Sequence, residues 1–293
     1  MFTGTFTALI TPFKGDESID EDALRSLVEA QIEAGITGLV PVGTTGESPT
    51  VTHEENLKVI EIVVDQAKGR VPVIAGTGSN STAEAIQMTR KAKEIGADAS
   101  LQVAPYYNKP NQDGFYRHFT AIADAVDLPM VVYNIPGRTG KNIETETLMR
   151  LAEHPNIVAV KEASGSIPQI MEVAARKPEG FDLLSGDDNL AFSVVALGGS
   201  GVVSVASNAA PGPVGKMIKL ALEGKLEKAR AEHYRLLPLF KMVFFDTNPI
   251  PIKYAMSLLG YCKEVYRLPL CELSEENKEK VKSVLENLTL LES

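Results

Sequence analysis

The run Ile157-Val158-Ala159-Val160-Lys161-Glu162 ends a series of β-branched and small apolar residues with a single amine. This composition predicts a buried strand, and the sequel Ala163-Ser164-Gly165-Ser166 predicts a loop. An amine at the mouth of an apolar strand loses its water, which disfavours the ammonium form and lowers the pKa. A neutral amine attacks carbonyl carbons and forms imines. The alternative is an ordinary strand-end lysine that reaches solvent or pairs with Glu162.

The composition predicts a globular protein with a sizeable core. The 293 residues carry a net charge of −9 and 44% hydrophobic side chains, which suits one large domain or two ordinary ones. Because no Lys/Arg-rich run occurs, we expect neither nucleic acid nor an anionic membrane as a partner. The N-terminus lacks the pattern of a signal peptide, and a cytoplasmic location is expected.

Metal and cofactor chemistry are not expected. His53-Glu54-Glu55-Asn56 begins like the helix of a zinc protease, but no second histidine follows at the required position. Cys262 and Cys271 form no metal or redox spacing and are expected to be free thiols. The uncharged stretch 190–215 is too rich in Gly, Ser and Pro for a transmembrane helix.

Short β-rich runs alternate with longer amphipathic segments at the spacing of βα units. The predicted strands are Thr5–Ile10, Gly38–Val42, Val71–Ala75, Ala99–Val103, Met130–Tyr133, Ile157–Val160, Phe181–Leu184 and Gly201–Val205. Eight such strands predict an α/β fold, a closed (β/α)8 TIM barrel. The alternative is an open doubly wound sheet, which favours a Gly-x-Gly-x-x-Gly turn after the first strand, and Thr11–Gly15 is not one.

The strand pattern stops after about residue 222. Lys225–Phe245, Pro251–Leu259 and Ser274–Leu291 predict helices, and no flexible linker precedes them. We therefore expect a barrel over 1–222 and a C-terminal helical extension over 223–293 that packs on it.

Two kinds of signal mark the helix boundaries. The S/T-x-x-E pattern of a capping box begins at Ser18, Thr52 and Ser81. Gly35, Gly69 and Gly96 stand where helices should stop.

Barrel enzymes place their chemistry on the loops after the strands. After the second predicted strand, Gly43-Thr44-Thr45-Gly46-Glu47-Ser48 offers hydroxyls and backbone N–H groups that suit a carboxylate, although it also suits a plain helix-capping turn. The fifth strand ends in Tyr133, with Arg138 five residues on. Asp187-Asp188 follow the seventh strand, and we expect a helix cap there rather than a catalytic dyad.

These groups predict one site because the loops converge on one end of the barrel. An amine, a phenol, a hydroxyl-rich anion loop and an arginine together suit condensation of an α-keto acid through an imine.

The same segments resemble the dihydrodipicolinate synthase family of pyruvate-dependent lysine aldolases, over essentially the whole chain. The resemblance is carried by Gly43–Glu47, Pro105-Tyr106-Tyr107-Asn108-Lys109-Pro110, Tyr133–Thr139, Lys161-Glu162, Leu184–Asp188 and Thr247-Asn248-Pro249-Ile250-Pro251. It implies condensation of pyruvate with aspartate semialdehyde by a homotetramer built from two tight dimers.

The resemblance also implies residue roles. Lys161 would form the Schiff base, and Tyr133, Thr44 and Tyr107 would relay protons, with Tyr107 supplied by the neighbouring subunit. Thr45 and the backbone of Val203 would hold pyruvate, Gly186 would line the pocket, and Arg138 would bind the carboxylate of the aldehyde. Some members are inhibited by lysine, and the matching positions are Pro49, His53, Asn56, Gly78, Asn80, Glu84 and Tyr106.

Three other functions are weighed against this one. N-acetylneuraminate lyases and sugar-acid aldolases share the amine and the tyrosine, but the sialic acid lyases lack the arginine found here as Arg138. A non-catalytic barrel would keep the fold without the chemistry. A phosphate-binding isomerase would use the glycines at 198, 199 and 201, which also fit the turn into the last strand.

Overall fold

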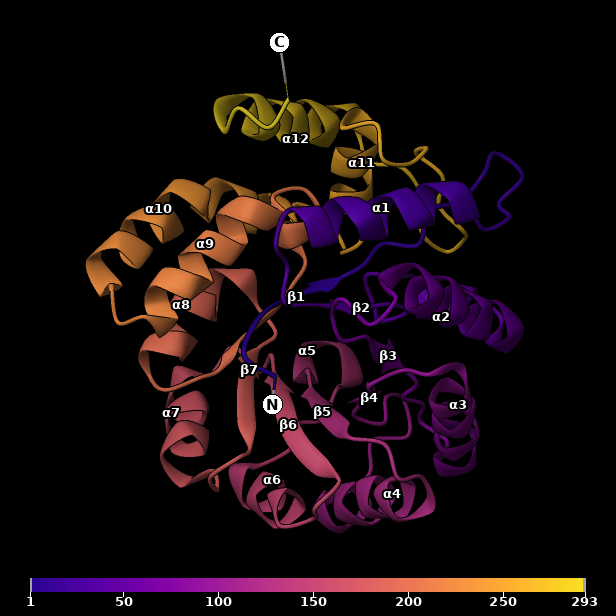
Figure 1. Cartoon of the computed structure of the whole chain (residues 1–293), viewed down its shortest axis with the longest axis vertical. Helices are drawn as coiled ribbons and strands as arrows, with labels where there is room; N and C mark the ends of the chain where they lie inside the picture. Colours follow the sequence, from indigo (N-terminus) through magenta and orange to yellow (C-terminus); the bar gives the residue numbers. More distant parts are fainter. Residues whose placement is uncertain (1, 292–293) are drawn as a thin grey trace.

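Eight short parallel strands lie at the centre of a ring of helices in the computed structural model, which describes residues 2–291 (Figure 1). The strands are β1 (Gly4–Ala8), β2 (Gly38–Val40), β3 (Ile74–Gly76), β4 (Ala99–Val103), β5 (Met130–Asn134), β6 (Ile157–Glu162), β7 (Asp182–Ser185) and β8 (Gly201–Ser204). All eight predicted strands are therefore present, with ends that differ from the prediction by at most three residues and agree completely at β4.

The strands form a nearly closed barrel. Their order is β2-β1-β8-β7-β6-β5-β4-β3, and every neighbouring pair is parallel. The remaining gap closes through a parallel bridge between Leu39 and Val73, flanked by a hydrogen bond of 3.0 Å from Leu39 N to Pro72 O. The predicted (β/α)8 TIM barrel is confirmed.

The helices that follow the strands form the outer layer. They are α1 (Glu21–Glu33), α2 (His53–Ala67), α3 (Thr82–Ile95), α4 (Gln112–Ala125), α6 (Thr145–Ala152), α7 (Ile167–Arg176), α8 (Asp188–Ala196) and α9 (Pro211–Leu222). Short helices sit in the loops at η1 (Ser48–Thr50), α5 (Pro136–Thr139) and η2 (Ala206–Asn208). None of the helices among residues 2–291 is both long and apolar enough to cross a membrane.

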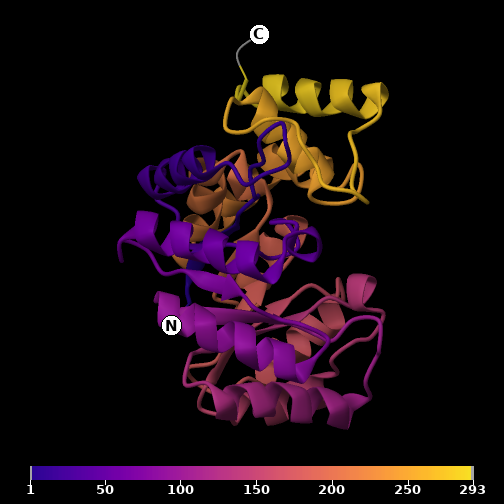
Figure 2. The ribbon, with the colours of Figure 1, turned by 90° about the vertical axis from the view of Figure 1, so that its right-hand side faces the viewer.

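Three helices follow the barrel: α10 (Leu226–Met242), α11 (Ile250–Leu258) and α12 (Glu275–Asn287). Helix α10 packs on α8 and α9, while α11 and α12 lie beside α1 at one end of the molecule (Figures 1 and 2). One apolar cluster joins these helices to the barrel, since Leu27 of α1, Met217 of α9, Phe240 of α10 and Leu285 of α12 all belong to it. Each of these side chains is almost completely buried.

The helix boundaries follow the sequence signals in part. Thr52 forms a complete capping box with Glu55 at the start of α2. The box predicted at Ser18 is wrong: Asp20 caps α1, and Ser18 instead bonds the Asp16 carboxylate. Gly96 adopts a left-handed φ of 102° at the end of α3, as a helix-stopping glycine should.

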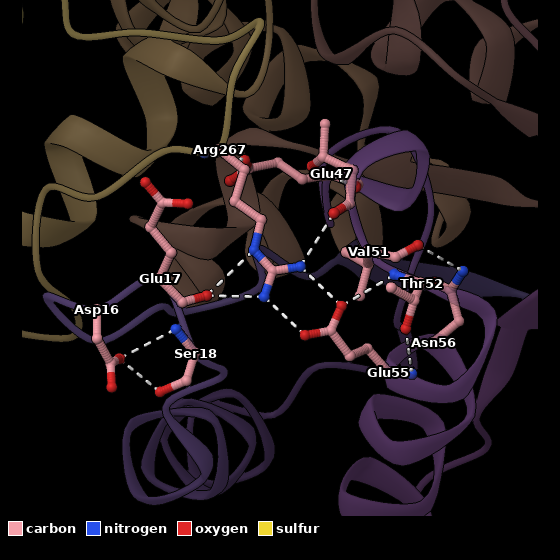
Figure 3. Close-up of polar contacts among 10 residues, drawn as sticks. Asp16, Glu17, Ser18, Glu47, Val51, Thr52, Glu55, Asn56 and Arg267 are labelled. Atoms are coloured by element: carbon pink, nitrogen blue, oxygen red, sulfur yellow. Dashed lines mark hydrogen bonds and ion pairs between the residues drawn. The ribbon is translucent and has the colours of Figure 1, made fainter.

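Arg267, in the segment between α11 and α12, ties the extension to the loop after β2 and to the start of α2 (Figure 3). Its guanidinium donates two bonds of 2.7 Å to the Glu55 carboxylate and one of 2.9 Å to Thr50 O. A second bond to the backbone reaches Glu17 O at 2.7 Å. Because the planar guanidinium donates in several fixed directions, it holds the segments around Glu17, Thr50 and Glu55 in one arrangement.

A buried ion pair makes a second connection between the same regions. Lys253 of α11 pairs with Glu47, and both side chains are 0% exposed. The ammonium also lies 3.9 Å from the centre of the Phe13 ring. Removing one partner of such a pair leaves a desolvated charge without compensation.

We therefore predict that Lys253→Met lowers the free energy of unfolding by about 3–5 kcal/mol, because Glu47 stays buried without its cation. The measurement is denaturant unfolding at neutral pH. Lys280→Met is the matched control, since it breaks an exposed pair with Glu276 and should change stability little. Equal losses in the two variants would contradict the prediction.

Candidate active site

Lys161 and Tyr133 lie side by side at the carboxyl ends of β6 and β5. The register of the two strands pairs them directly. Both side chains are 5% exposed, and the Lys161 amine lies 4.1 Å from the centre of the Tyr133 ring. Burial lowers the pKa of Lys161 to about 8. The amine forms no ion pair with any residue in 2–291, in contrast to the buried Lys253.

The Tyr133 phenol faces the loop that follows β2. Burial raises the pKa of this phenol above its usual value, so it is protonated at neutral pH. Thr44 of this loop lines the same cavity as Tyr133. A phenol with a hydroxyl-bearing residue beside it and an amine over its ring can accept and donate protons.

The loop from Val42 to Ser48 has an unusual backbone. Val42 and Glu47 have positive φ values of 49° and 56°. Such a conformation is costly for a β-branched residue and is found where surrounding structure enforces it, commonly at functional sites. Gly46 fits against this backbone, because an added Cβ would lie 3.0 Å from Val42 Cα.

Gly186 lies next to Lys161, and Val203 lies in the apolar cluster that contains Tyr133. A Cβ on Gly186 would lie 3.2 Å from Lys161 Cε and 2.6 Å from the Ala163 Cβ, so no larger residue fits there without a shift. Val203 is buried in β8 within the apolar cluster that fills the barrel and also contains Tyr133. Of the two predicted pocket-lining residues, Gly186 is therefore the one in contact with the Lys161 side chain.

The acidic pair after β7 differs from the predicted helix cap. Asp187 occupies the N-cap position of α8, but its side chain makes no capping bond. Burial raises its pKa to about 6, and its charge interacts with that of Lys161. Asp188 accepts bonds of 3.0 Å from the backbone N–H groups of Val205 and Ala206 and thus fixes the end of β8.

A cavity of about 420 Å³ opens beside Tyr133 and Thr44. It is lined by Val42, Gly43, Thr44, Ser48, Pro49, Val51, His53, Asn56, Gly76, Thr77, Gly78, Ser79, Glu84, Met88, Leu101, Val103, Tyr106, Tyr133 and Arg138. Its volume suits a small organic molecule. The cavity joins the rim around Tyr133 to a polar cluster near α2 and α3.

That polar cluster contains most of the positions matched to a lysine site. His53 Nε2 lies 2.8 Å from Glu84 Oε1, and the Ser79 hydroxyl donates to the other Glu84 oxygen. Asn80 Nδ2 donates to Tyr106 O at 3.1 Å. The Glu84 carboxylate therefore bonds His53 and Ser79, and it does not bond the backbone N–H of Ser81 as the predicted capping box requires. Pro49, Asn56 and Gly78 line the same cavity.

Arg138 lies on the short helix α5, with an exposed side chain at the edge of the cavity. Its Nη2 donates to Asn248 O at 2.9 Å, and Asn248 Nδ2 donates to Thr45 Oγ1 at 3.1 Å. Sequence reasoning assigned no role to Asn248. The segment Thr247–Pro251 supported the family resemblance, but its residue types indicated no particular chemical role.

Tyr107 stands apart from the other site residues within this chain. Its ring is 90% exposed and its φ is 68°. It is not among the residues that line the cavity.

A buried amine against a tyrosine ring, on the loop end of a (β/α)8 barrel, defines the class of barrel lyases that act on small carbonyl substrates. The particular family follows from comparison with known proteins. The model of the dihydrodipicolinate synthetase family matches residues 1–288, and the chain belongs to this family.

Relatives match the chain along its whole length. The 4-hydroxy-tetrahydrodipicolinate synthase of Pelobacter propionicus is 50% identical over 291 residues, which are 99% of this chain and 100% of the relative. The crystal structure of dihydrodipicolinate synthase from Aquifex aeolicus is 49% identical, covers 100% of both chains and superposes with a TM-score of 0.98. The DHDPS structure from Cyanidioschyzon merolae, with lysine bound, is 43% identical over 99% of each chain, with a TM-score of 0.96.

The resemblance seen in the sequence is confirmed, and with it the activity. The chain is a lyase that condenses pyruvate with L-aspartate 4-semialdehyde to 4-hydroxy-tetrahydrodipicolinate, in lysine and diaminopimelate biosynthesis.

The Asp187 carboxylate favours the ammonium form of Lys161, so Asp187→Asn should lower the pKa of Lys161 below about 8. Because only the neutral amine reacts with acetic anhydride, the pH midpoint of Lys161 acetylation should move down. The measurement is competitive acetylation followed by mass spectrometry of the Lys161 peptide. Asp113→Asn, at an exposed acid on α4, should leave the midpoint unchanged. A midpoint that stays or rises in Asp187→Asn would refute the interaction.

Proposed function

We propose that Lys161 is the residue that forms the Schiff base with pyruvate. The observation that carries this proposal is its unpaired, buried amine against the Tyr133 ring. The amine attacks the keto carbon of pyruvate, and the resulting carbinolamine loses water to give an imine. Tyr133 supplies the proton that leaves with this water, and Thr44 connects the phenol to the next donor.

The later steps use the same groups. The Tyr133 phenolate left by the dehydration takes up a methyl proton, which converts the imine into an enamine. The enamine carbon attacks the aldehyde carbon of aspartate semialdehyde, and Tyr133 returns the proton to the aldehyde oxygen, which becomes the product hydroxyl. The amino group of the bound product then attacks the imine carbon. Ring closure breaks the bond to the enzyme nitrogen and releases Lys161 as a free amine.

The carboxylates of the two substrates are held by different groups in this proposal. Thr45 and the loop backbone after β2 hold the pyruvate carboxylate, with Gly186 leaving room above Lys161 and the backbone of Val203 at the opposite wall. Arg138 binds the carboxylate of the aldehyde, since its exposed guanidinium stands at the edge of the cavity.

We further propose that the complete site requires a second subunit. Tyr107 is almost fully exposed on a left-handed backbone, which suits an aromatic residue that inserts into a partner's site. The proposed assembly is a cytoplasmic homotetramer of two tight dimers, in which the barrel (1–222) carries the chemistry and 223–293 packs on it. Tyr107→Phe should slow turnover with an unchanged unfolding temperature, and full activity would remove this residue from the mechanism.

Lysine is the proposed inhibitor. His53, Glu84 and Tyr106 line the cavity, Asn80 bonds Tyr106 O, and the Cyanidioschyzon merolae structure contains lysine. A carboxylate and a histidine suit the ammonium and carboxylate of a free amino acid. A steady-state assay that shows no inhibition at millimolar lysine would exclude this regulation.

Borohydride reduction in the presence of pyruvate tests the central proposal. We expect the mass of one reduced pyruvyl group on the peptide that contains Lys161, and no such mass in Lys161→Ala. Arg138→Ala is the matched variant: it should trap pyruvate normally but lose at least about tenfold in kcat/KM for aspartate semialdehyde, because a charge-assisted contact is lost. Labelling at another lysine would refute the proposal, and equal loss of both functions in Arg138→Ala would refute the role of the arginine.

A further inference from the structure

Asn248 lies between α10 and α11 and is 5% exposed. Its side-chain amide donates to Thr45 Oγ1 at 3.1 Å, and its backbone carbonyl accepts from Arg138 Nη2 at 2.9 Å. It does not line the cavity. The residue therefore contacts Thr45 and Arg138 from outside the cavity.

The bond to Thr45 determines where the threonine hydroxyl can point. A hydroxyl has one hydrogen and two acceptor positions. When Oγ1 accepts the Asn248 amide, its hydrogen remains available for a second partner. Thr45 is 3% exposed in the strained loop after β2, beside the cavity-lining Thr44. No residue in 2–291 accepts the Thr45 hydrogen, which is thus available to a carboxylate.

Asn248 belongs to the C-terminal extension, and the neighbouring helix α11 fixes its position. The helix α11 begins two residues later, and its Lys253 forms the buried ion pair with Glu47. Glu47 belongs to the same loop as Thr45. Besides the contacts of Arg267, the loop is therefore bound to the extension through the Asn248 amide and through the Lys253 charge.

We propose that Asn248 is a positioning residue, which presents the Thr45 hydroxyl to the carboxylate of pyruvate and makes the C-terminal extension a part of the active site. This inference rests on the proposed role of Thr45. It assigns to Asn248 no contact with substrate. Its effect is therefore expected in the KM for pyruvate, and only when the Thr45 hydroxyl is present.

A double-mutant cycle tests the proposal in the full-length enzyme. The four proteins are wild type, Asn248→Ala, Thr45→Val and Asn248→Ala/Thr45→Val, assayed for KM and kcat with both substrates. Loss of an oriented bond to a carboxylate should raise the KM for pyruvate about tenfold in each single variant. In the Thr45→Val background, Asn248→Ala should change this KM by less than about twofold. The KM for aspartate semialdehyde should change little, since Asn248→Ala keeps the backbone carbonyl that binds Arg138.

Two controls separate positioning from structural damage. Asn248→Asp keeps the shape but cannot donate to Thr45, so it should raise the KM for pyruvate at least as much as Asn248→Ala, even if the latter folds poorly. Asn156→Ala also removes a partly buried side-chain amide, one that donates to Ala123 O at 3.1 Å before the amino end of β6, and it should leave both KM values unchanged.

The outcomes distinguish this inference from the proposed function. If Thr45→Val leaves the KM for pyruvate unchanged, the role of Thr45 is wrong and the inference falls with it. If Thr45→Val raises this KM but Asn248→Ala raises it by the same factor in both backgrounds, only the inference is overturned. A lower unfolding temperature and kcat with constant KM in Asn248→Ala and Asn248→Asp would also overturn it.

Discussion

The desolvation of one amine is the constraint on which the active site depends. Lys161 is inward-facing at the end of β6, and the barrel removes its water without supplying an ion-pair partner. Closure of the sheet, the tight fit of Gly186 and the parallel register with Tyr133 all serve to keep this amine dry and in place. Asp187 opposes the effect, and the pKa near 8 is the balance of the two.

The C-terminal helices are more than a cover for the barrel. They share its largest apolar cluster and reach the loop after β2 through Asn248, Lys253 and Arg267. That loop contains two positive-φ residues, which an isolated segment would not hold. The contacts from the extension therefore offset the strain that shapes the rim of the site.

Sequence reasoning reached the fold because its signals are local. Alternation of strands and helices identified all eight strands, and β4 was predicted with its observed ends. The pattern at Ser18 failed because Asp20 lies closer to the first helical turn and competes for the same cap. Asp187 was predicted to cap α8 with its side chain. It occupies the N-cap position, but the sequence does not show which way the carboxylate points.

The candidate site was predictable where residues follow strand ends, and not where distant segments meet. Lys161, Tyr133, Thr44 and Arg138 could be found because a barrel brings its loops to one rim. The bond from Asn248 to Thr45 spans 203 residues and the ion pair of Lys253 with Glu47 spans 206, so no periodicity connects them. The placement of Tyr107 depends on a partner chain and stays a prediction.

The cavity lies at the place where β2 and β3 close the barrel. Elsewhere the barrel wall is a ladder of registered pairs, but here it closes through the Leu39–Val73 bridge and a bond of 3.0 Å from Gly76 N to Pro41 O. The cavity lies across this joint, with Val42 on one side and Gly76 on the other. A molecule that fills the cavity therefore contacts both sides of this joint, and its binding stabilises the closed form of the barrel wall there.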